Sequence, residues 1–144
     1  MTVVDNPAGD PFIERWNEFY EGVNDVAATL ALYPVSGTPE EVVVGMPLRR
    51  EVTQPAGMYS APAMFGLADV TGTWLAMLNV AEGVFPLAVQ SSINVVSNTK
   101  SGDVTATATI VRAGRTLIVT DTKVCDEHGK LLTNVVTTYV VTQR

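Results

Sequence analysis

The hydrophobic and polar positions follow three successive patterns along the chain. Near the start, apolar residues recur at helical spacing: Phe12, Trp16, Phe19, Tyr20 and Val23. This spacing predicts an amphipathic helix over about 11–24, with Asp10 as its cap and Pro11 in its first turn. Residues 1–9 lack such a pattern, and we expect them to be flexible.

The segment 26–48 is less regular. Residues 26–33 fit either a helix or a strand, residues 34–39 (Pro-Val-Ser-Gly-Thr-Pro) are typical of a turn, and residues 41–48 are rich in valine. We therefore expect two early strands joined by a loop over 34–39. Pro47 indicates a sheet edge or the end of a strand, because proline cannot donate a ladder hydrogen bond.

The middle of the chain is almost continuously apolar from Ala61 to Leu78. Ser60 is a suitable N-cap and Pro62 fits the first helical turn, so the pattern predicts one long helix. The segment is close to the length that crosses a membrane, but a central Asp69, two glycines and a proline favour a helix buried in protein.

From Pro86 onward the pattern has a period of two, as in Val104–Ile110, where apolar residues alternate with threonine. It predicts strands over about 87–96, 103–112, 115–125 and 131–142, separated by segments of turn residues. An antiparallel sheet wrapped around the one long central helix would cover an element that is hydrophobic on nearly all sides. We predict a single α+β domain spanning residues 1–144.

Composition narrows the possible functions. The net charge is −6 and the longest basic run is Arg49-Arg50, so a nucleic-acid partner is not expected. Only 17% of residues are charged, which favours an oligomer that hides apolar surface. Cys125 is the one cysteine and no secretory signal is recognisable, so we expect a cytoplasmic protein without a membrane partner.

Asp69 is the first candidate for chemistry. It is the only charged residue between Glu51 and Glu82, and it lies in the most apolar part of the chain. An unpartnered carboxylate in apolar surroundings costs several kcal/mol or acquires a shifted pKa. Two interpretations follow: a functional acid, or a helix carboxylate satisfied by Thr71, Thr73 or a backbone N–H.

The residues around Asp69 resemble hotdog-fold acyl-CoA thioesterases, in particular the phenylacetate-pathway type. That family has a loop Gln or Asn, a His-Gly-Gly step, and a helix reading Leu-Ala-Asp or Leu-Ala-Glu. Gln54 lies fifteen residues before the acid, Gly66-Leu-Ala-Asp69 matches the helix, and Ser60-Ala61-Pro62 stands where His-Gly-Gly would. Ser91–Asn94, Gly102-Asp103 and Gly114-Arg115 also look like the family's strands and hairpin, and the resemblance covers roughly residues 42–141.

The resemblance implies the hotdog fold and hydrolysis of an aryl, medium or long acyl-CoA. Asp69 would attack the thioester or activate water, the Ala61 N–H would hold the oxyanion, and Gln54 and Thr73 would position water. In the family these groups come from two subunits, which implies a homodimer and often a homotetramer. Coenzyme A is part of the substrate, and no metal or other cofactor is expected.

Six further residues are candidates for substrate binding: Ser60, Met64, Phe65, Asn94, Arg112 and Arg115. Met64 and Phe65 are near enough in sequence to Asp69 to line an acyl pocket, although both would also serve in packing. The two arginines could meet the phosphates of coenzyme A, although cations on strands are usually only solvated.

Two other functions stay open. A hotdog hydratase or dehydratase pairs a His with an acid, but His128, the one histidine, falls in a predicted hairpin turn. A hotdog domain that binds acyl-CoA or a related small ligand without catalysis is the other, and the replacement of His-Gly-Gly favours it. A zinc site is not expected from one His and one Cys.

Overall fold

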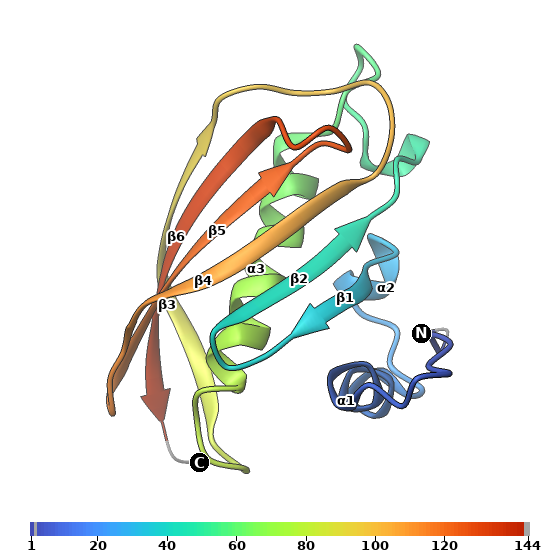
Figure 1. Ribbon diagram of the computed structural model, residues 1–144. Coiled ribbons are helices and arrows are strands. Elements are labelled where there is room, and N and C mark those ends of the chain that lie inside the picture. Colours follow the sequence, from blue (N-terminus) through green and yellow to red (C-terminus); the bar gives the residue numbers. More distant parts are fainter. Residues whose placement is uncertain (2, 143–144) are drawn as a thin grey trace.

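The computed structural model describes residues 1 and 3–142. In chain order the elements are α1 (Pro11–Tyr20), α2 (Val26–Thr29), β1 (Tyr33–Gly37), β2 (Glu41–Met46), a 3-10 turn (Arg50–Val52), α3 (Ala61–Met77), β3 (Phe85–Val95), β4 (Val104–Ala113), β5 (Leu117–Cys125) and β6 (Leu131–Thr142). The strands form one antiparallel sheet in the order β1-β2-β4-β5-β6-β3, which curves around α3 (Figure 1). The predicted α+β hotdog fold is confirmed.

The central helix α3 forms where the apolar run predicted it. The Ser60 side chain caps it by accepting from the Ala63 N–H at 3.2 Å, and Pro62 lies in its first turn, as expected. Ten of its residues are buried, and the sheet supplies most of their neighbours. Among the residues that the structure describes, no helix has the length and hydropathy needed to cross a membrane.

The first helix packs its aromatic side against α3. The Asp10 carboxylate caps α1 by accepting from the Phe12 and Ile13 N–H groups, and the Trp16 ring stacks on Trp74 with a centroid separation of 5.4 Å. The helix ends at Tyr20, four residues earlier than predicted. Gly22 has a φ of 69°, a left-handed conformation that glycine adopts readily and that helices do not contain.

The prediction for residues 26–39 was wrong in its boundaries. Asp25 caps a short helix, α2, so the first strand begins at Tyr33 and runs through Pro34 to Gly37. Pro34 is tolerated because β1 lies at the edge of the sheet, where one side of the strand needs no N–H donors. The turn into β2 is therefore short and begins at Thr38, whose N–H donates to the Glu41 carbonyl at 2.8 Å.

The last long strands are not all consecutive neighbours. β4, β5 and β6 form successive hairpins, but β3 pairs with β6 at the far edge of the sheet, and residues 96–103 carry the chain across to β4 (Figure 1). β3 contains no charged residue, and five of its large apolar side chains are exposed: Phe85, Leu87, Val89, Ile93 and Val95. This edge therefore presents an apolar strand with one unpaired side.

Candidate active site

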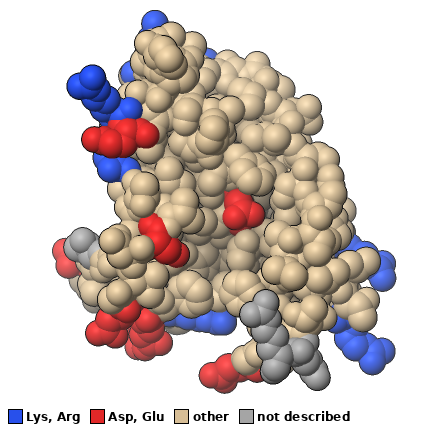
Figure 2. All heavy atoms as spheres, turned by 180° about the vertical axis from the view of Figure 1, so that it is seen from behind, with Lys and Arg blue, Asp and Glu red and all other residues tan. Residues whose placement is uncertain are grey.

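Asp69 opens into a pocket of about 170 Å³. The pocket lies where α3, α1 and the start of β3 meet, and it is lined by Phe19, Tyr20, Asp25, Asp69, Val70, Thr73, Trp74, Met77 and Phe85. Asp69, Thr73 and Met77 follow one another at four-residue intervals, so they share one face of α3. Figure 2 shows the face of the molecule opposite to that in Figure 1. This face is broad and mostly uncharged, with a few isolated carboxylates and with Lys and Arg at its margins.

The environment of the Asp69 carboxyl favours its neutral form. The side chain is half-buried, and burial raises the pKa of this carboxyl above the usual value for aspartate. In the described part of the chain, no cation lines the pocket and no residue donates a hydrogen bond to this carboxylate. A carboxyl in this state can accept a proton from water near neutral pH more readily than an exposed one.

The two threonines that could have satisfied Asp69 are bonded elsewhere. The Thr71 hydroxyl donates to the Leu67 carbonyl at 2.7 Å, inside the helix. The Thr73 hydroxyl donates to the Tyr139 hydroxyl at 3.3 Å. The interpretation of Asp69 as a carboxylate satisfied by these neighbours is therefore not supported.

The wall opposite Asp69 is aromatic. Trp74 donates its indole N–H to the Tyr20 hydroxyl at 3.2 Å, and Phe19 packs edge-on against Trp74 with a centroid separation of 5.1 Å. Burial is the main cause that raises the pKa of Tyr20 to about 12, so its hydroxyl stays neutral. Because these polar atoms satisfy each other, the wall offers an acyl group a mainly apolar surface.

The start of α3 forms a second, shallower pocket. Ala61, Pro62 and Phe65 line it from the helix, and Ser91 and Ile93 line it from β3. Ala61 is exposed at the first helical position, where the N–H has no partner within the helix. Phe65 lies one turn before Asp69 on the same face, so the two pockets follow the same side of α3.

The structure does not bring Gln54 to the Asp69 pocket of its own chain. Gln54 lies in the loop before α3, where its side-chain oxygen accepts from the Ala56 N–H and its backbone N–H donates to Met58 at 2.8 Å. Both contacts are local and hold the turn. Within one chain, Gln54 therefore has no contact with the Asp69 carboxyl.

Two of the expected substrate-binding residues lie away from both pockets. Met64 was expected beside the acyl group, but it is fully buried in the core, where its sulfur accepts from the Thr133 hydroxyl at 3.2 Å. Asn94 pairs with Asn134 across β3 and β6, and Asn134 bonds Asp121 on the sheet face opposite α3. The two-residue period of the strand turns Asn94 outward while Ile93 faces the helix.

The two arginines also lie outside the Asp69 pocket. Arg112 is exposed near the end of β4. Arg115 is exposed in the following turn and lines a separate groove with Asn79, Val80, Ala81, Val84 and Val141. Neither forms an ion pair with a described residue. Both charges are therefore available to an anion at this end of the molecule.

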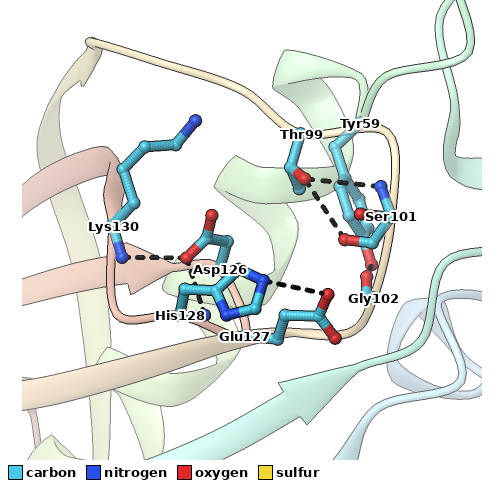
Figure 3. Close-up of polar contacts among 8 residues, drawn as sticks. All are labelled: Tyr59, Thr99, Ser101, Gly102, Asp126, Glu127, His128 and Lys130. Carbon is cyan, nitrogen blue, oxygen red and sulfur yellow. Dashed lines mark hydrogen bonds and ion pairs between the residues drawn. The ribbon is translucent and has the colours of Figure 1, made fainter.

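His128 lies in an exposed turn between β5 and β6, as predicted. Figure 3 shows it beside Glu127, with 3.5 Å between the imidazole Nε2 and the carboxylate. The Asp126 carboxylate holds the turn by accepting from the His128 and Lys130 N–H groups at 2.9 and 2.8 Å. No group of three or more His, Cys, Asp or Glu side chains within the described ranges is placed to hold a metal ion.

Sequence reasoning missed several groups near Asp69. Phe19 and Tyr20 were expected on the apolar face of the first helix, and Trp74 falls in the apolar run of the long helix. Neither pattern could show that these residues meet around Asp69. Tyr139 was not singled out, although its position in the alternating strand β6 predicts that it faces the helix. Nothing in the sequence connects it to Thr73, which is 66 positions away.

Comparison with known proteins gives a family and a fold. The model of the thioesterase superfamily matches residues 57–133, more than half of the 144-residue chain. A thioesterase from Haemophilus influenzae is 24% identical with a TM-score of 0.84, covering 90% of each chain. A mutant thioesterase from Pseudomonas aeruginosa is 23% identical with a TM-score of 0.82, covering 97% of this chain and 99% of that one.

A hypothetical thioesterase protein from Streptococcus pneumoniae, solved with coenzyme A, is 22% identical with a TM-score of 0.71. The match covers 78% of this chain and 90% of that one. At these identities the three solved structures establish the shared fold. The superfamily match itself includes Asp69 and Thr73 but begins after Gln54.

Proposed function

This chain belongs to the thioesterase superfamily, and from that premise we propose that it hydrolyses the thioester of an acyl-CoA. The observation that carries the proposal is the half-buried Asp69 carboxyl with its raised pKa in a pocket beside Thr73. A carboxyl whose environment is arranged in this way, without a satisfying partner among the described residues, is typical of a catalytic acid or base. The coenzyme A bound to the Streptococcus pneumoniae relative supports the choice of thioester.

We assign Asp69 the role of general base. Its ionised form takes a proton from water while the water oxygen attacks the thioester carbonyl carbon. The tetrahedral intermediate then collapses, the carbon–sulfur bond breaks, and the leaving thiolate takes up the proton to give a carboxylic acid and free coenzyme A. The nearby Thr73 hydroxyl supports attack by water over direct attack by the carboxylate, because it offers a second contact for that water.

The N-terminus of α3 is the proposed oxyanion site. The Ala61 N–H is free of intrahelical partners and lies at the positive end of the helix dipole. Such a donor strengthens its contact as negative charge develops on the carbonyl oxygen, and removing one donor in other enzymes costs about 2.7–4 kcal/mol. Ser60 stays bound as the cap and keeps this N-terminus in place.

The size of the Asp69 pocket supports an aryl acyl group rather than a long chain. Its volume is about 170 Å³, and an apolar cavity of about 150 Å³ can hold one benzene molecule. Phe19, Tyr20 and Trp74 offer ring faces and edges to such a group. This size supports a protein of the phenylacetate-pathway type of thioesterase, and we expect arylacyl-CoA to be its better substrate.

A second copy of the chain completes the proposed site. β3 exposes an uncharged apolar edge, and it lies beside the helix face that carries Phe65 and Asp69. Pairing of two such edges would bury this face and bring the partner's loop and its Gln54 toward Asp69. We propose a homodimer, or a dimer of such dimers, in which Arg112 or Arg115 meets a phosphate of coenzyme A.

The test is hydrolysis of a panel of aryl and fatty acyl-CoAs, measured as the release of free coenzyme A thiol. We expect turnover of arylacyl-CoA, and a fall in kcat of about 10²–10⁴-fold in Asp69→Asn, the range that a general base contributes. Asp5→Asn is the control, since Asp5 is exposed near the amino terminus and lines neither pocket. Full activity in Asp69→Asn would reject the mechanism.

One observation favours a second candidate, a domain that binds acyl-CoA without hydrolysing it. Ser60-Ala61-Pro62 replaces the His-Gly-Gly step that the family commonly carries, and Pro62 has no N–H to donate. Isothermal titration with a non-hydrolysable acyl-CoA separates the two functions. Tight binding together with an absence of turnover across the panel would favour the binding domain over the enzyme.

A further inference from the structure

Beneath the Asp69 pocket, the Thr73 hydroxyl meets a group of hydroxyls that the proposed function does not use. Thr73 on α3 donates to the Tyr139 hydroxyl at 3.3 Å, and Thr120 and Thr137 flank that hydroxyl from β5 and β6. Tyr139 and Thr120 are fully buried and Thr137 is nearly so. We call these four residues the hydroxyl cluster. It joins the pocket wall to the inner face of the sheet.

A glycine makes room for this cluster. An added Cβ at Gly72 would lie 2.8 Å from the Tyr139 hydroxyl and 3.0 Å from the Thr120 hydroxyl, both closer than such contacts normally come. Glycine is otherwise unfavourable inside a helix. α3 thus carries a glycine next to Thr73 at the point where the tyrosine hydroxyl approaches, which indicates that the approach itself is a feature of the fold.

The direction of the bond from Thr73 to Tyr139 has a chemical consequence. A threonine hydroxyl has one hydrogen and two lone pairs. When its hydrogen is held by Tyr139, only its lone pairs remain for the pocket that Thr73 lines with Asp69. Thr73 then acts as an acceptor toward water and cannot compete for the water's own lone pair.

A water molecule between two acceptors has a defined orientation. One hydrogen points to the Asp69 carboxylate, the other points to Thr73, and a lone pair is left for the carbonyl carbon. Burial raises the pKa of Tyr139 to about 12, so this tyrosine stays protonated and uncharged while it holds Thr73. Its hydroxyl keeps this hydrogen and can donate it in a hydrogen bond to a flanking threonine.

We propose that Tyr139 is a positioning residue for hydrolysis, which fixes the Thr73 hydroxyl as an acceptor so that the attacking water is aligned between Thr73 and Asp69. This inference rests on the proposed thioesterase function and adds a residue that touches neither substrate nor water. Tyr139 acts on the reacting water only through Thr73.

The experiment is a double-mutant cycle on Thr73 and Tyr139, read as kcat and KM separately. Tyr139→Phe removes one oxygen and keeps the ring, so we expect kcat to fall about 10-fold or more, toward the ~100-fold that a misplaced reacting group can cost. KM for acyl-CoA should stay within about twofold, since substrate contacts are untouched. Thr73→Val should lower kcat by at least as much, and the double variant should be no worse than Thr73→Val alone.

Tyr59→Phe is the matched control. Tyr59 is as buried as Tyr139, but its hydroxyl donates to the Gly102 carbonyl at 2.8 Å, away from the pocket (Figure 3). It should lower thermal stability without changing kcat. If Tyr139→Phe fails to fold, Gly72→Ala provides the same test, because it keeps all four hydroxyls and displaces that of Tyr139.

The outcomes separate the two proposals. Turnover in the wild type that Asp69→Asn abolishes, with wild-type kcat in Tyr139→Phe, would overturn the positioning role and leave the thioesterase proposal intact. Losses in kcat that simply multiply in the double variant would also overturn it, because independent structural damage behaves in that way. An absence of turnover in the wild type would overturn the enzyme proposal and this inference together.

Discussion

At the scale of single residues, the main feature of this protein is the apolar environment of the Asp69 carboxyl. Asp69 is half-buried between an aromatic wall and its own helix, and burial is the cause that raises its pKa. The folded protein therefore holds the Asp69 proton more tightly than the unfolded chain does. The same property that suits this group to accept a proton makes its ionised form costly to the fold.

This cost predicts that Asp69→Asn stabilises the protein while it removes activity. Below the ordinary aspartate pKa of about 3.9 both states carry a neutral side chain, and the wild type and the variant should melt alike. As pH rises from there through the raised pKa of folded Asp69, the wild type loses stability and the variant does not. Calorimetry at several pH values measures the difference, which should be largest at neutral pH.

Asp5→Asn is the control for this prediction, because Asp5 is exposed near the amino terminus. It should show no growing difference in melting temperature with pH. A lower melting temperature for Asp69→Asn than for the wild type at pH 7 would mean that contacts in the folded protein stabilise the Asp69 carboxylate. That result would contradict the prediction that its ionised form destabilises the fold.

At the scale of elements, α1 decides the shape of the pocket. α3 supplies the acid, but the wall opposite it depends on α1, which is held to α3 by the stacking of Trp16 on Trp74 and by the bond from Trp74 to Tyr20. Phe19 lies at the rim, 44% exposed, and contacts both Tyr20 and Trp74. If the proposed acyl group occupies this pocket, its length is limited by a helix outside the sheet.

Phe19→Ala should therefore change acyl preference. Removing the ring opens the rim, so kcat/KM for arylacyl-CoA should fall by about 2- to 10-fold, the equivalent of an aromatic contact of about 0.5–1.5 kcal/mol. Activity toward longer fatty acyl-CoAs should rise relative to arylacyl-CoA. Competition between the two substrates in one assay measures the ratio directly.

Glu18→Ala, a change at an exposed neighbour on α1 that does not line this pocket, controls for general effects on the helix. It should leave the ratio of the two substrates as in the wild type. An unchanged ratio in Phe19→Ala would show that the acyl group does not reach this wall.

At the scale of the whole molecule, the β3 edge of the sheet is an apolar surface that a partner could cover. β3 presents its unpaired side and apolar residues with no charge to prevent pairing. The loop residue Gln54 is held by local bonds in its own chain, away from Asp69. A second copy that pairs along β3 would cover this apolar edge. It would also allow Gln54 of one copy to approach Asp69 of the other.

We predict that Val95→Lys on β3 separates the subunits and lowers activity at least 10-fold, because a buried lysine without a partner costs several kcal/mol. Light scattering coupled to size exclusion should find the wild type at two or four times the 15.4 kDa chain mass, and the variant at a smaller assembly. Val111→Lys, at an exposed valine on β4, is the matched control.

A wild-type protein that is monomeric at assay concentrations and fully active would contradict the dimer proposal. So would a Val95→Lys variant that keeps the wild-type assembly. Dissociation by Val111→Lys in place of Val95→Lys would move the interface from β3 to another part of the sheet.

The sequence determined the elements and much of their order. Caps at Asp10 and Ser60, the apolar run of α3 and the period of two after Pro86 are local signals, because each depends on residues within one or two turns of a helix or along one strand. They predicted a sheet wrapped around one long helix and singled out Asp69, and the family resemblance supplied the name of the fold. They failed at 26–39, where Pro34 indicates a turn unless the strand is known to lie at a sheet edge.

Only the tertiary structure decided what surrounds Asp69. Met64 and Phe65 are neighbours in sequence, yet one is buried in the core and the other lines a surface pocket, because a helix turns about 100° per residue and only packing fixes which side faces in. The aromatic wall and the contact between Thr73 and Tyr139 join segments far apart in the chain. Such contacts depend on how the sheet curves around α3, and no local pattern carries that information.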